Sequence, residues 1–301
     1  MMVPQLILFI VFIVTPWEME ANNELISIKQ FESKYVTERD IFVRLPDSYN
    51  EEIKYPVLYM HDGQMLFSTL DTWNGQSWRL DEVIDSLVLE GAIEDIILVG
   101  ISSVSQERHS NYFPEKPFNS LESSYRDSLR NIDRYGSPMF GIDVNSDDYL
   151  KFIVYELKPY IDNRFSTLSD VSNTFIAGSS MGGLISMYAF FEYPEIFGGA
   201  ACISTHWIGS FSDNSEIPDA FYSYLDARKE SVSGRKLYFD IGTATLDQYY
   251  PVHQRRMDQI FRSVEESIDF DFSTEVYEGE PHTEIAWSKR VHEALTFLLA
   301  D

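Results

Sequence analysis

Cysteine is nearly absent from this chain, and its scarcity removes two kinds of structure. Cys202 is the only cysteine among 301 residues. An intramolecular disulfide needs two cysteines and a thiolate metal cluster needs several, so both are excluded. Cys202 lies in the apolar stretch 198–203, which predicts a buried small side chain rather than a reactive thiol.

Basic residues are also scarce, with 23 Lys and Arg against 48 Asp and Glu, a net charge of −25. A field of this sign repels nucleic-acid phosphates and anionic membrane surfaces. We therefore expect no nucleic-acid partner, and we interpret the acidic residues as a solvated surface. Hydrophobic residues make up 44% of the chain, enough for a large core and too many for wholesale disorder.

The longest apolar run, residues 6–14, has nine residues and is too short to span a bilayer. It fits the hydrophobic region of a signal peptide, although no Lys or Arg precedes it and no small-x-small cleavage site follows. We interpret residues 1–22 as a signal peptide, which predicts export to the periplasm or the medium without a stable membrane anchor. The alternative is a start codon assigned too early, with a cytoplasmic domain that begins near Asn23.

Strand-like and helix-like segments alternate from residue 23 to 301 without internal repeats or a long linker, which predicts a single domain. The expected strands are 25–31, 40–45, 57–60, 96–101, 174–177, 200–204, 236–241 and 270–277, and the expected helices are 78–89, 148–165, 182–193 and 284–299. The first two strands alternate polar and apolar residues, as an antiparallel opening does. The rest predict an α/β fold whose mostly parallel sheet has helices on both faces. Pro159 predicts a kink or break in its helix.

The stretch from about residue 102 to 147 shows little periodicity and is rich in Ser, Asn, Pro and aromatic residues. Such a long irregular segment is usually functional or disordered. It would lie at the carboxyl ends of the strands, where α/β sheets bind ligands. We interpret it as an inserted lid-like segment that contacts substrate.

The strongest motif is Gly178-Ser179-Ser180-Met181-Gly182, a Gly-x-Ser-x-Gly sequence between an apolar strand and a helix. This context is that of a nucleophile elbow, in which a strained turn projects the serine hydroxyl outward. A Cβ at either glycine would clash with neighbouring chain. Ser180 is therefore the candidate nucleophile, and the Met181 N–H at the helix start is a candidate oxyanion donor.

A serine hydroxyl needs a base, and only three histidines follow Ser180 in the chain. His282 lies in a turn between the last strand and the last helix, which is where this type of fold presents its base. His206 follows the next strand and, with Trp207, is a candidate for lining the pocket. His253 lies in a further segment that we expect to be helical, and we expect a structural role for it.

The acid that orients the histidine should follow the strand before the last one. Asp247 lies in the loop beyond strand 236–241 and is the preferred acid, while Asp240 inside that strand is the alternative. A second oxyanion donor should come from the loop after strand 57–60. There Gly63 permits a tight turn that aims the Gln64 N–H into the site.

His61 and Asp62 precede that turn and are candidate pocket residues. No spacing of His, Cys and Asp residues suggests a metal site, and acyl transfer to serine requires neither a metal nor another cofactor.

Three motifs together resemble one family. Residues 59–64, residues 178–183 and the sequence His282-x-Glu284-x-x-Trp287 are similar to those of the putative esterase (esterase D-like) family of the α/β-hydrolase superfamily. That family includes feruloyl and acetyl-xylan esterases, S-formylglutathione hydrolases, siderophore esterases and mycolyltransferases. The resemblance covers about residues 25–300. It implies an α/β-hydrolase fold with Ser180 as nucleophile, His282 as base, and Gln64 and Met181 as backbone donors.

Two positions depart from the family pattern. Relatives place the acid two or three residues after the glycine, where this chain has Ala244 and Thr245, so Asp247 takes the role if the loop is longer. Thr283 follows the histidine where many relatives have Asn, a change that we expect to be minor.

The sequence therefore predicts a serine esterase for a small-molecule or carbohydrate-linked ester. Five aromatic residues could receive a sugar or phenolic group or else pack in the core: Trp73, Trp78, Tyr112, Phe113 and Trp207. Two other hypotheses stay open at this point. One is acyl transfer to a sugar or lipid alcohol, and the other is a catalytically silent binding module on the same fold.

Overall fold

The structure of the chain is a computed structural model that describes residues 25–70, 72–134, 136–265 and 267–300. The interpretation of residues 1–22 as a signal peptide lies outside these ranges. In the part of the chain that is described, no helix is both long enough and apolar enough to cross a membrane.

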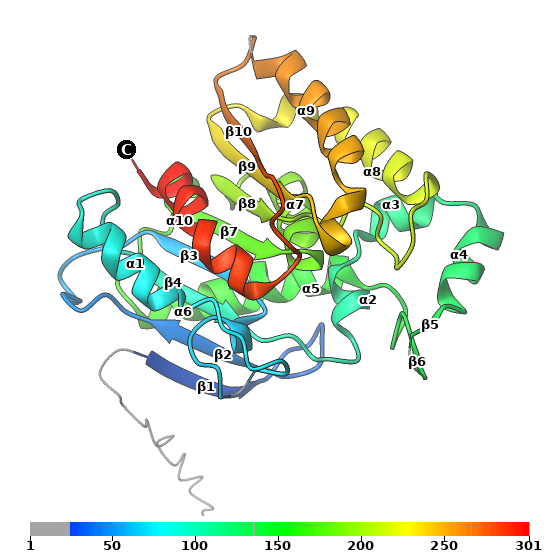
Figure 1. Cartoon of the computed structure of the whole chain (residues 1–301). Coiled ribbons are helices and arrows are strands. Elements are labelled where there is room, and N and C mark those ends of the chain that lie inside the picture. Colours follow the sequence, from blue (N-terminus) through cyan, green and yellow to red (C-terminus); the bar gives the residue numbers. More distant parts are fainter. Residues whose placement is uncertain (1–24, 71, 135, 266, 301) are drawn as a thin grey trace, which may run out of the picture.

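An eight-stranded sheet runs through the middle of the molecule (Figure 1), with the strand order β1-β2-β4-β3-β7-β8-β9-β10. The strands are β1 (Leu25–Phe31), β2 (Arg39–Arg44), β3 (Val57–His61), β4 (Ile97–Ile101), β7 (Thr174–Ser179), β8 (Gly199–Ile203), β9 (Arg235–Gly242) and β10 (Phe270–Tyr277). β2 is antiparallel to both β1 and β4, whereas all further pairs are parallel. The predicted antiparallel opening and mostly parallel sheet are confirmed.

Helices cover both faces of this sheet, as expected. They are α1 (Leu80–Leu89), α2 (Arg108–Tyr112), α3 (Glu115–Ser120), α4 (Ser123–Arg130), α5 (Ser146–Phe152), α6 (Lys158–Arg164), α7 (Met181–Glu192), α8 (Glu216–Asp226), α9 (Pro251–Glu265) and α10 (Glu284–Leu299). Successive strand residues point to opposite faces of the sheet, so each parallel strand contributes side chains to two hydrophobic cores, one on each face. In β3, Leu58 and Met60 join the cluster beneath α1 and α10, while Val57 and Tyr59 join the cluster beneath α5, α6, α7 and α9.

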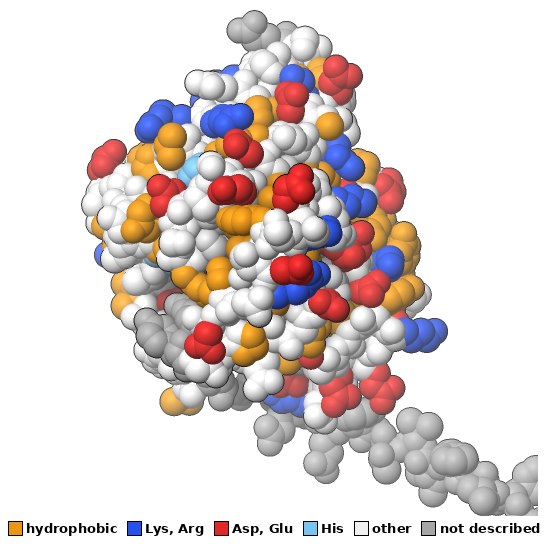
Figure 2. Space-filling view, turned by 90° about the vertical axis from the view of Figure 1, so that its right-hand side faces the viewer, with side chains coloured by type: hydrophobic (Ala, Val, Ile, Leu, Met, Phe, Trp, Pro, Cys, Tyr) orange, Lys and Arg blue, Asp and Glu red, His pale blue; other side chains and the backbone are white. Residues whose placement is uncertain are grey.

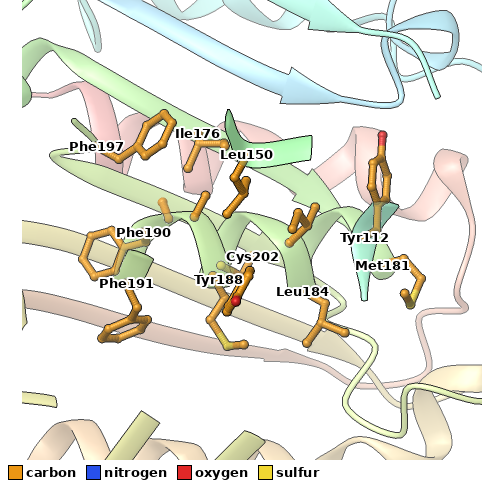
Figure 3. Packing of buried hydrophobic residues seen from close by; sticks show 14 of the residues in the cluster. Tyr112, Leu150, Ile176, Met181, Leu184, Tyr188, Phe190, Phe191, Phe197 and Cys202 are labelled. Atoms are coloured by element: carbon orange, nitrogen blue, oxygen red, sulfur yellow. The ribbon is translucent and has the colours of Figure 1, made fainter. Parts of the chain in front are cut away.

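Helix α7 lies in the larger of these two cores, and all its residues from Met181 to Phe191 are buried. A helix that is apolar all round needs cover on every side. Figure 3 shows its Leu184 and Tyr188 within the cluster that also holds Ile176 of β7 and Cys202 of β8. Cys202 is fully buried as predicted, and burial raises the pKa of its thiol. The thiol therefore stays protonated and unreactive.

The segment predicted as one helix over 148–165 is continuous but changes type along its length. Between α5 and α6 the residues Ile153–Leu157 form a π-helix. Pro159 is the second residue of α6, and its ring has no N–H and crowds the carbonyl one turn earlier. A wider π turn just before a proline accommodates that crowding, so the helix changes type here without the predicted break. A kink at Pro159 stays a prediction.

The segment 102–147 contains three short helices, α2, α3 and α4, and a hairpin of β5 (Asp133–Arg134) with β6 (Ser137–Pro138). It occupies the right-hand part of Figure 1. Helices of five to eight residues are too short to give a periodic pattern, which is why the sequence predicted a loop here. Its Phe113 and Phe118 are buried in the main core. A lid function for this segment stays a prediction.

Candidate active site

Ser180 sits at the sharp turn between β7 and α7. Its backbone has φ 58° and ψ −120°, a strained conformation for a residue other than glycine. Its N–H donates to the Ile203 carbonyl at 2.8 Å, and its carbonyl accepts from the His206 N–H at 3.2 Å. A Cβ at Gly178 would lie 2.7 Å from the Gly182 carbonyl carbon, so the turn excludes a side chain there. This geometry is that of a nucleophile elbow.

Asp247 and His282 are in direct contact. The Nδ1 atom of His282 is hydrogen-bonded to Oδ1 of Asp247, which is completely buried in the short 3-10 helix Thr245–Tyr249 after β9. The other carboxylate oxygen accepts from the Gly242 N–H at 2.7 Å. The backbone N–H of His282 donates to the Thr245 hydroxyl at 2.8 Å, which joins the loops that follow β9 and β10.

Ser204, at the end of β8, gives Asp247 a third contact, from its Oγ to Oδ2 at 2.6 Å. The same hydroxyl oxygen accepts from Trp287 Nε1 at 3.0 Å and from Arg290 Nη2 at 2.6 Å. A hydroxyl has one proton and two lone pairs. Because both lone pairs are occupied, its proton must point at Asp247.

Asp240, the alternative acid, faces a different partner. Its Oδ1 accepts from Arg290 Nη2 at 2.9 Å and from the Ser204 N–H at 3.1 Å. Burial raises the pKa of this carboxyl to about 6, although the charge of Arg290 opposes the rise. Of the two candidate acids, therefore, Asp247 contacts the imidazole and Asp240 does not.

His206 and Tyr250 connect the elbow with His282. The His206 N–H donates to the Ser180 carbonyl, and its Nδ1 is hydrogen-bonded to the Tyr250 hydroxyl at 2.6 Å. The Tyr250 ring lies 5.9 Å from the His282 ring, centroid to centroid. No hydrogen bond joins the Ser180 hydroxyl to His282 in the described residues, and such contacts are often long in unliganded enzymes.

The predicted second donor, Gln64, lies on the 3-10 turn Gly63–Met65 at the end of β3. Asp62 precedes the turn with φ 58°, and its carbonyl accepts from the Met65 N–H at 2.8 Å. A Cβ at Gly63 would lie 2.6 Å from the carbonyl carbon of Gly100, so the turn rests directly on β4. We call residues 62–65 the oxyanion loop, after the role that the sequence predicts for the Gln64 N–H.

The oxyanion loop lies against the elbow. A Cβ on Gly182 would lie 3.3 Å from Cβ of His61 and 3.5 Å from Oδ2 of Asp62. Gly182 is the second residue of α7, directly after Met181. The structure thus brings the Gln64 turn and the first turn of α7, which carry the two predicted backbone donors, to the same place.

The polar pocket candidates are all buried. Burial lowers the pKa of His61 to about 3, so its ring is neutral, and its Nδ1 is hydrogen-bonded to the Tyr149 hydroxyl at 2.8 Å. Burial also lowers the pKa of His206, and the charges of His109 and His282 lower it further. Asp62 forms an ion pair with Arg108.

The aromatic candidates divide into core and surface. Trp207 is completely buried and donates from Nε1 to Gln254 at 2.9 Å, which gives it a packing role here. Trp78, Tyr112 and Phe113 are buried too, whereas Trp73 is 82% exposed. A role for any of them in binding substrate stays a prediction.

Three polar residues around the site were not predicted from the sequence, namely Arg108, Ser204 and Arg290. Each contacts a partner distant in the chain, so no local motif marks it.

His253, expected to be structural, lies on α9, and its Nδ1 is hydrogen-bonded to the Tyr222 hydroxyl at 2.6 Å. In the part of the chain that is described, no group of three or more His, Cys, Asp or Glu side chains is placed to hold a metal ion.

Solved structures share this fold. A ferulic acid esterase matches with a TM-score of 0.63 and 20% identity over 92% of this chain and 98% of that one. The BES protein from Bacillus cereus matches with a TM-score of 0.64 and 16% identity over 94% and 98%. The enterobactin esterase FES from Shigella flexneri matches with a TM-score of 0.63 and 16% identity over 92% of this chain and 60% of that one. The fold is therefore the α/β-hydrolase fold of these esterases.

Similar sequences include two uncharacterised proteins of Bacillus subtilis strain 168. YjcH is 23% identical over 293 residues, covering 93% of this chain and all of that protein, and YbbA is 26% identical over 58% and 59% of the two chains. An endo-1,4-beta-xylanase/feruloyl esterase of Xylanibacter ruminicola is 28% identical over 52% of this chain and 18% of its own length. The model of the family described as "Putative esterase" matches residues 33–297. This chain therefore belongs to that esterase family, and its membership supports the hydrolysis of carboxylic esters.

Proposed function

We propose that this protein is a serine esterase that forms an acyl-enzyme on Ser180, with His282 as general base and Asp247 as the acid that orients it. The contact between Asp247 and Nδ1 of His282 carries the proposal. When Nδ1–H donates to a carboxylate, the neutral ring has its free lone pair on Nε2. That nitrogen is the one that takes the serine proton in a Ser-His-Asp triad.

The reaction proceeds in two halves. Ser180 Oγ attacks the ester carbonyl while its proton passes to His282, and the tetrahedral intermediate collapses when His282 returns that proton to the departing alcohol. Water then gives a proton to His282 and attacks the acyl-enzyme. The second collapse releases the carboxylic acid and restores the Ser180 hydroxyl, so no proton or electron is left over.

The oxyanion of both intermediates would accept hydrogen bonds from the N–H groups of Gln64 and Met181. Met181 is the first residue of α7, so the positive end of the helix dipole adds to its N–H. Groups fixed in advance act without reorganisation during the reaction. Loss of one such donor typically lowers kcat by about 10²–10³.

Asp247 supports the imidazolium that forms on His282. It is completely buried, and three groups fix its two oxygens, namely His282, the Gly242 N–H and the Ser204 hydroxyl. A carboxylate held in this way favours the charged imidazole and prevents the ring from turning.

We propose a small-molecule or carbohydrate-linked ester as substrate. The names of similar proteins, a feruloyl esterase and an enterobactin esterase, make aromatic acyl esters the first compounds to test. The test is hydrolysis of p-nitrophenyl and methyl hydroxycinnamate esters by the wild type, Ser180→Ala and Ser179→Ala. Ser179 is the adjacent hydroxyl in β7 and makes a matched control.

We expect Ser180→Ala to lower kcat by about 10⁴-fold or more, and Ser179→Ala to stay close to the wild type. Hydrolysis that persists in Ser180→Ala would contradict the proposed nucleophile. A folded wild type that cleaves none of these esters, but forms a new ester when a sugar or lipid alcohol is added, would favour acyl transfer. No reaction of either kind would favour a silent binding module.

A further inference from the structure

Arg108 of α2 reaches from the segment 102–147 to the oxyanion loop. Its Nε donates to Asp62 Oδ1 and its Nη2 donates to Asp62 Oδ2, each at 2.7 Å. Two parallel bonds between a planar guanidinium and a planar carboxylate fix orientation as well as distance. The pair is mostly shielded from water, since the two side chains are 31% and 12% exposed.

Gln64 is joined to the same segment by a second pair of bonds. Its Nε2 donates to the Ser103 hydroxyl at 2.9 Å, and its Oε1 accepts from the Ser103 N–H at 3.1 Å. Asp62 and Gln64 flank Gly63, which rests on Gly100 of β4. The two residues on either side of Gly63 are therefore held by hydrogen bonds of their side chains, and Gly63 itself is held by close packing against Gly100.

The pKa shifts of Asp62 and Arg108 keep both members of this ion pair charged. Burial alone would raise the pKa of the Asp62 carboxyl. The charge and hydrogen bonds of Arg108, with smaller contributions from a Ser103 hydrogen bond and from His61, outweigh burial and hold this pKa below its usual value. Asp62 in turn raises the pKa of the Arg108 guanidinium against the opposing effect of burial. The pair is therefore charged on both sides across the working pH range.

The Arg108 guanidinium packs against a buried aromatic ring. Its guanidinium carbon lies 5.1 Å from the centroid of the Tyr112 ring. Tyr112 is completely buried, and its ring centroid lies 5.2 Å from that of His61 and 5.2 Å from that of Tyr149. The guanidinium thus cannot swing away without leaving an aromatic face and an unpaired buried carboxylate.

We infer that Arg108 is a positioning residue for ester hydrolysis, which acts through Asp62 to hold the Gln64 N–H in line with the Met181 N–H. The inference rests on the proposed function, because it assumes that these two groups bind the oxyanion. Since Asp62 occupies two of its donors and neutralises its charge, Arg108 acts on the loop and not as an anchor for an anionic substrate. The segment 102–147 thereby contributes to catalysis from outside the hydrolase core.

The test compares kcat and KM for p-nitrophenyl acetate in Arg108→Gln, Arg108→Lys and Arg256→Gln. Arg256 is the matched control because it pairs with Asp219 at 2.8 Å and lies 4.3 Å from the Tyr222 ring, yet it lies on the exposed side of α9. A small acetate ester makes few contacts beyond the reacting carbonyl, so the effect of a displaced Gln64 N–H is measured as a lower kcat. The melting temperature of each variant is measured alongside.

We expect Arg108→Gln to lower kcat about ten- to a hundredfold with KM within about threefold, because a displaced donor loses much of its effect on the transition state. Arg108→Lys keeps the charge but loses one of the parallel bonds, so its kcat should lie between those of Arg108→Gln and wild type. Arg256→Gln should match the wild type. A fluorophosphonate should label Arg108→Gln to full stoichiometry but more slowly.

A double substitution separates this role from a general loss of structure. Asp62→Asn and Arg108→Gln break the same pair, so the double variant should lose no more kcat than the worse single one. Additive losses would contradict the inference, and so would an unchanged kcat in Arg108→Gln. A loss confined to KM would mean instead that Arg108 binds substrate.

The outcomes also distinguish this inference from the proposed function. If Ser180→Ala abolishes hydrolysis and Arg108→Gln does not change kcat, only the inference fails. If Ser180→Ala stays active, the proposed function itself fails. Should Arg108→Gln not fold, Arg108→Lys decides, because an unchanged kcat in that folded variant overturns the inference.

Discussion

The carboxylate of Asp247 is hydrogen-bonded to the His282 ring and has no exposed surface. Asp247→Asn keeps the shape of the side chain but no longer stabilises the imidazolium, and it can hold the wrong tautomer of the ring. We therefore expect kcat to fall by about 10⁴ while the melting temperature changes little. Steady-state kinetics and thermal unfolding of the purified variant measure both quantities.

Asp240→Asn is the control for that variant. Asp240 lies inside β9 and pairs with Arg290. Its substitution breaks that pair without touching His282, so it should affect stability more than kcat. A crippled Asp240→Asn beside an active Asp247→Asn would reverse the assignment of the acid.

The buried ring of His61 predicts a pH dependence of stability. Its pKa is lowered to about 3 in the folded protein, while an unfolded histidine titrates near its ordinary value of about 6.5. Between these two values the unfolded chain binds the extra proton, so this group's contribution to stability is full above about pH 6.5 and is lost as the pH falls toward 3.

The substitution His61→Gln removes the titrating ring and can still hydrogen-bond the Tyr149 hydroxyl. Urea unfolding from pH 7 to pH 4 should show the wild type losing about 1.4 kcal/mol per pH unit more than the variant once the pH is below about 6. Parallel curves for the two proteins would show that the ring is not held neutral.

At the scale of elements, the elbow depends on close contact between backbones. A Cβ at Gly178 would lie 2.7 Å from the Gly182 carbonyl carbon, so Gly178→Ala must displace β7 from α7. We expect a loss of about 1–3 kcal/mol in the free energy of unfolding. A displacement of about 1 Å at a nucleophile can lower kcat/KM by about 10².

Gly234→Ala provides the comparison for this variant. Gly234 has φ +71°, and its added Cβ would meet nothing within 4 Å. Alanine there strains the backbone without displacing a neighbour, so kcat/KM should not change. Equal kinetic losses in both variants would mean that the clash at the elbow is not the cause.

Elements with a strong local pattern could be predicted from the sequence, and those shaped by tertiary contacts could not. Strand β10 and helix α10 have the predicted bounds. The strand has a clear alternation of residues, and the helix has a clear helical periodicity. The π-helix before Pro159 and the short helices of segment 102–147 had no such signal. The π-helix follows from crowding by the nearby Pro159, and the short helices follow from packing against residues far away in the chain.

The same distinction applies to the site. Ser180 and His282 could be found because a motif or a turn between two elements marks each of them. Arg108 could not, since its partner Asp62 lies 46 residues earlier and nothing near Arg108 in the sequence announces the pair. The choice between Asp247 and Asp240 likewise needed the fold, which shows the partner of each carboxylate.

At the scale of the whole molecule, one face of the surface shows how the charges are distributed. Figure 2, which faces the right-hand side of Figure 1, shows Asp and Glu side chains dispersed among Lys, Arg and hydrophobic ones. Charges of mixed sign spread in this way, with a net charge of −25, favour solubility.

We propose that residues 1–22 direct export and are dispensable for folding and catalysis. A chain that begins at residue 23 should be soluble, with kcat within about twofold of the full chain, because a signal peptide is removed from the mature protein. Size-exclusion chromatography and the ester assay check this. An insoluble or inactive shortened chain would show that the segment packs on the domain.

The most direct test of the account is to find where the acyl group is carried. The protein is mixed with p-nitrophenyl acetate, quenched in acid within milliseconds to seconds, digested and analysed by mass spectrometry. We predict an acetyl group on Ser180 in the wild type and none on the corresponding peptide of Ser180→Ala. An acetyl group on another residue during turnover, or turnover that continues in Ser180→Ala, would contradict the account.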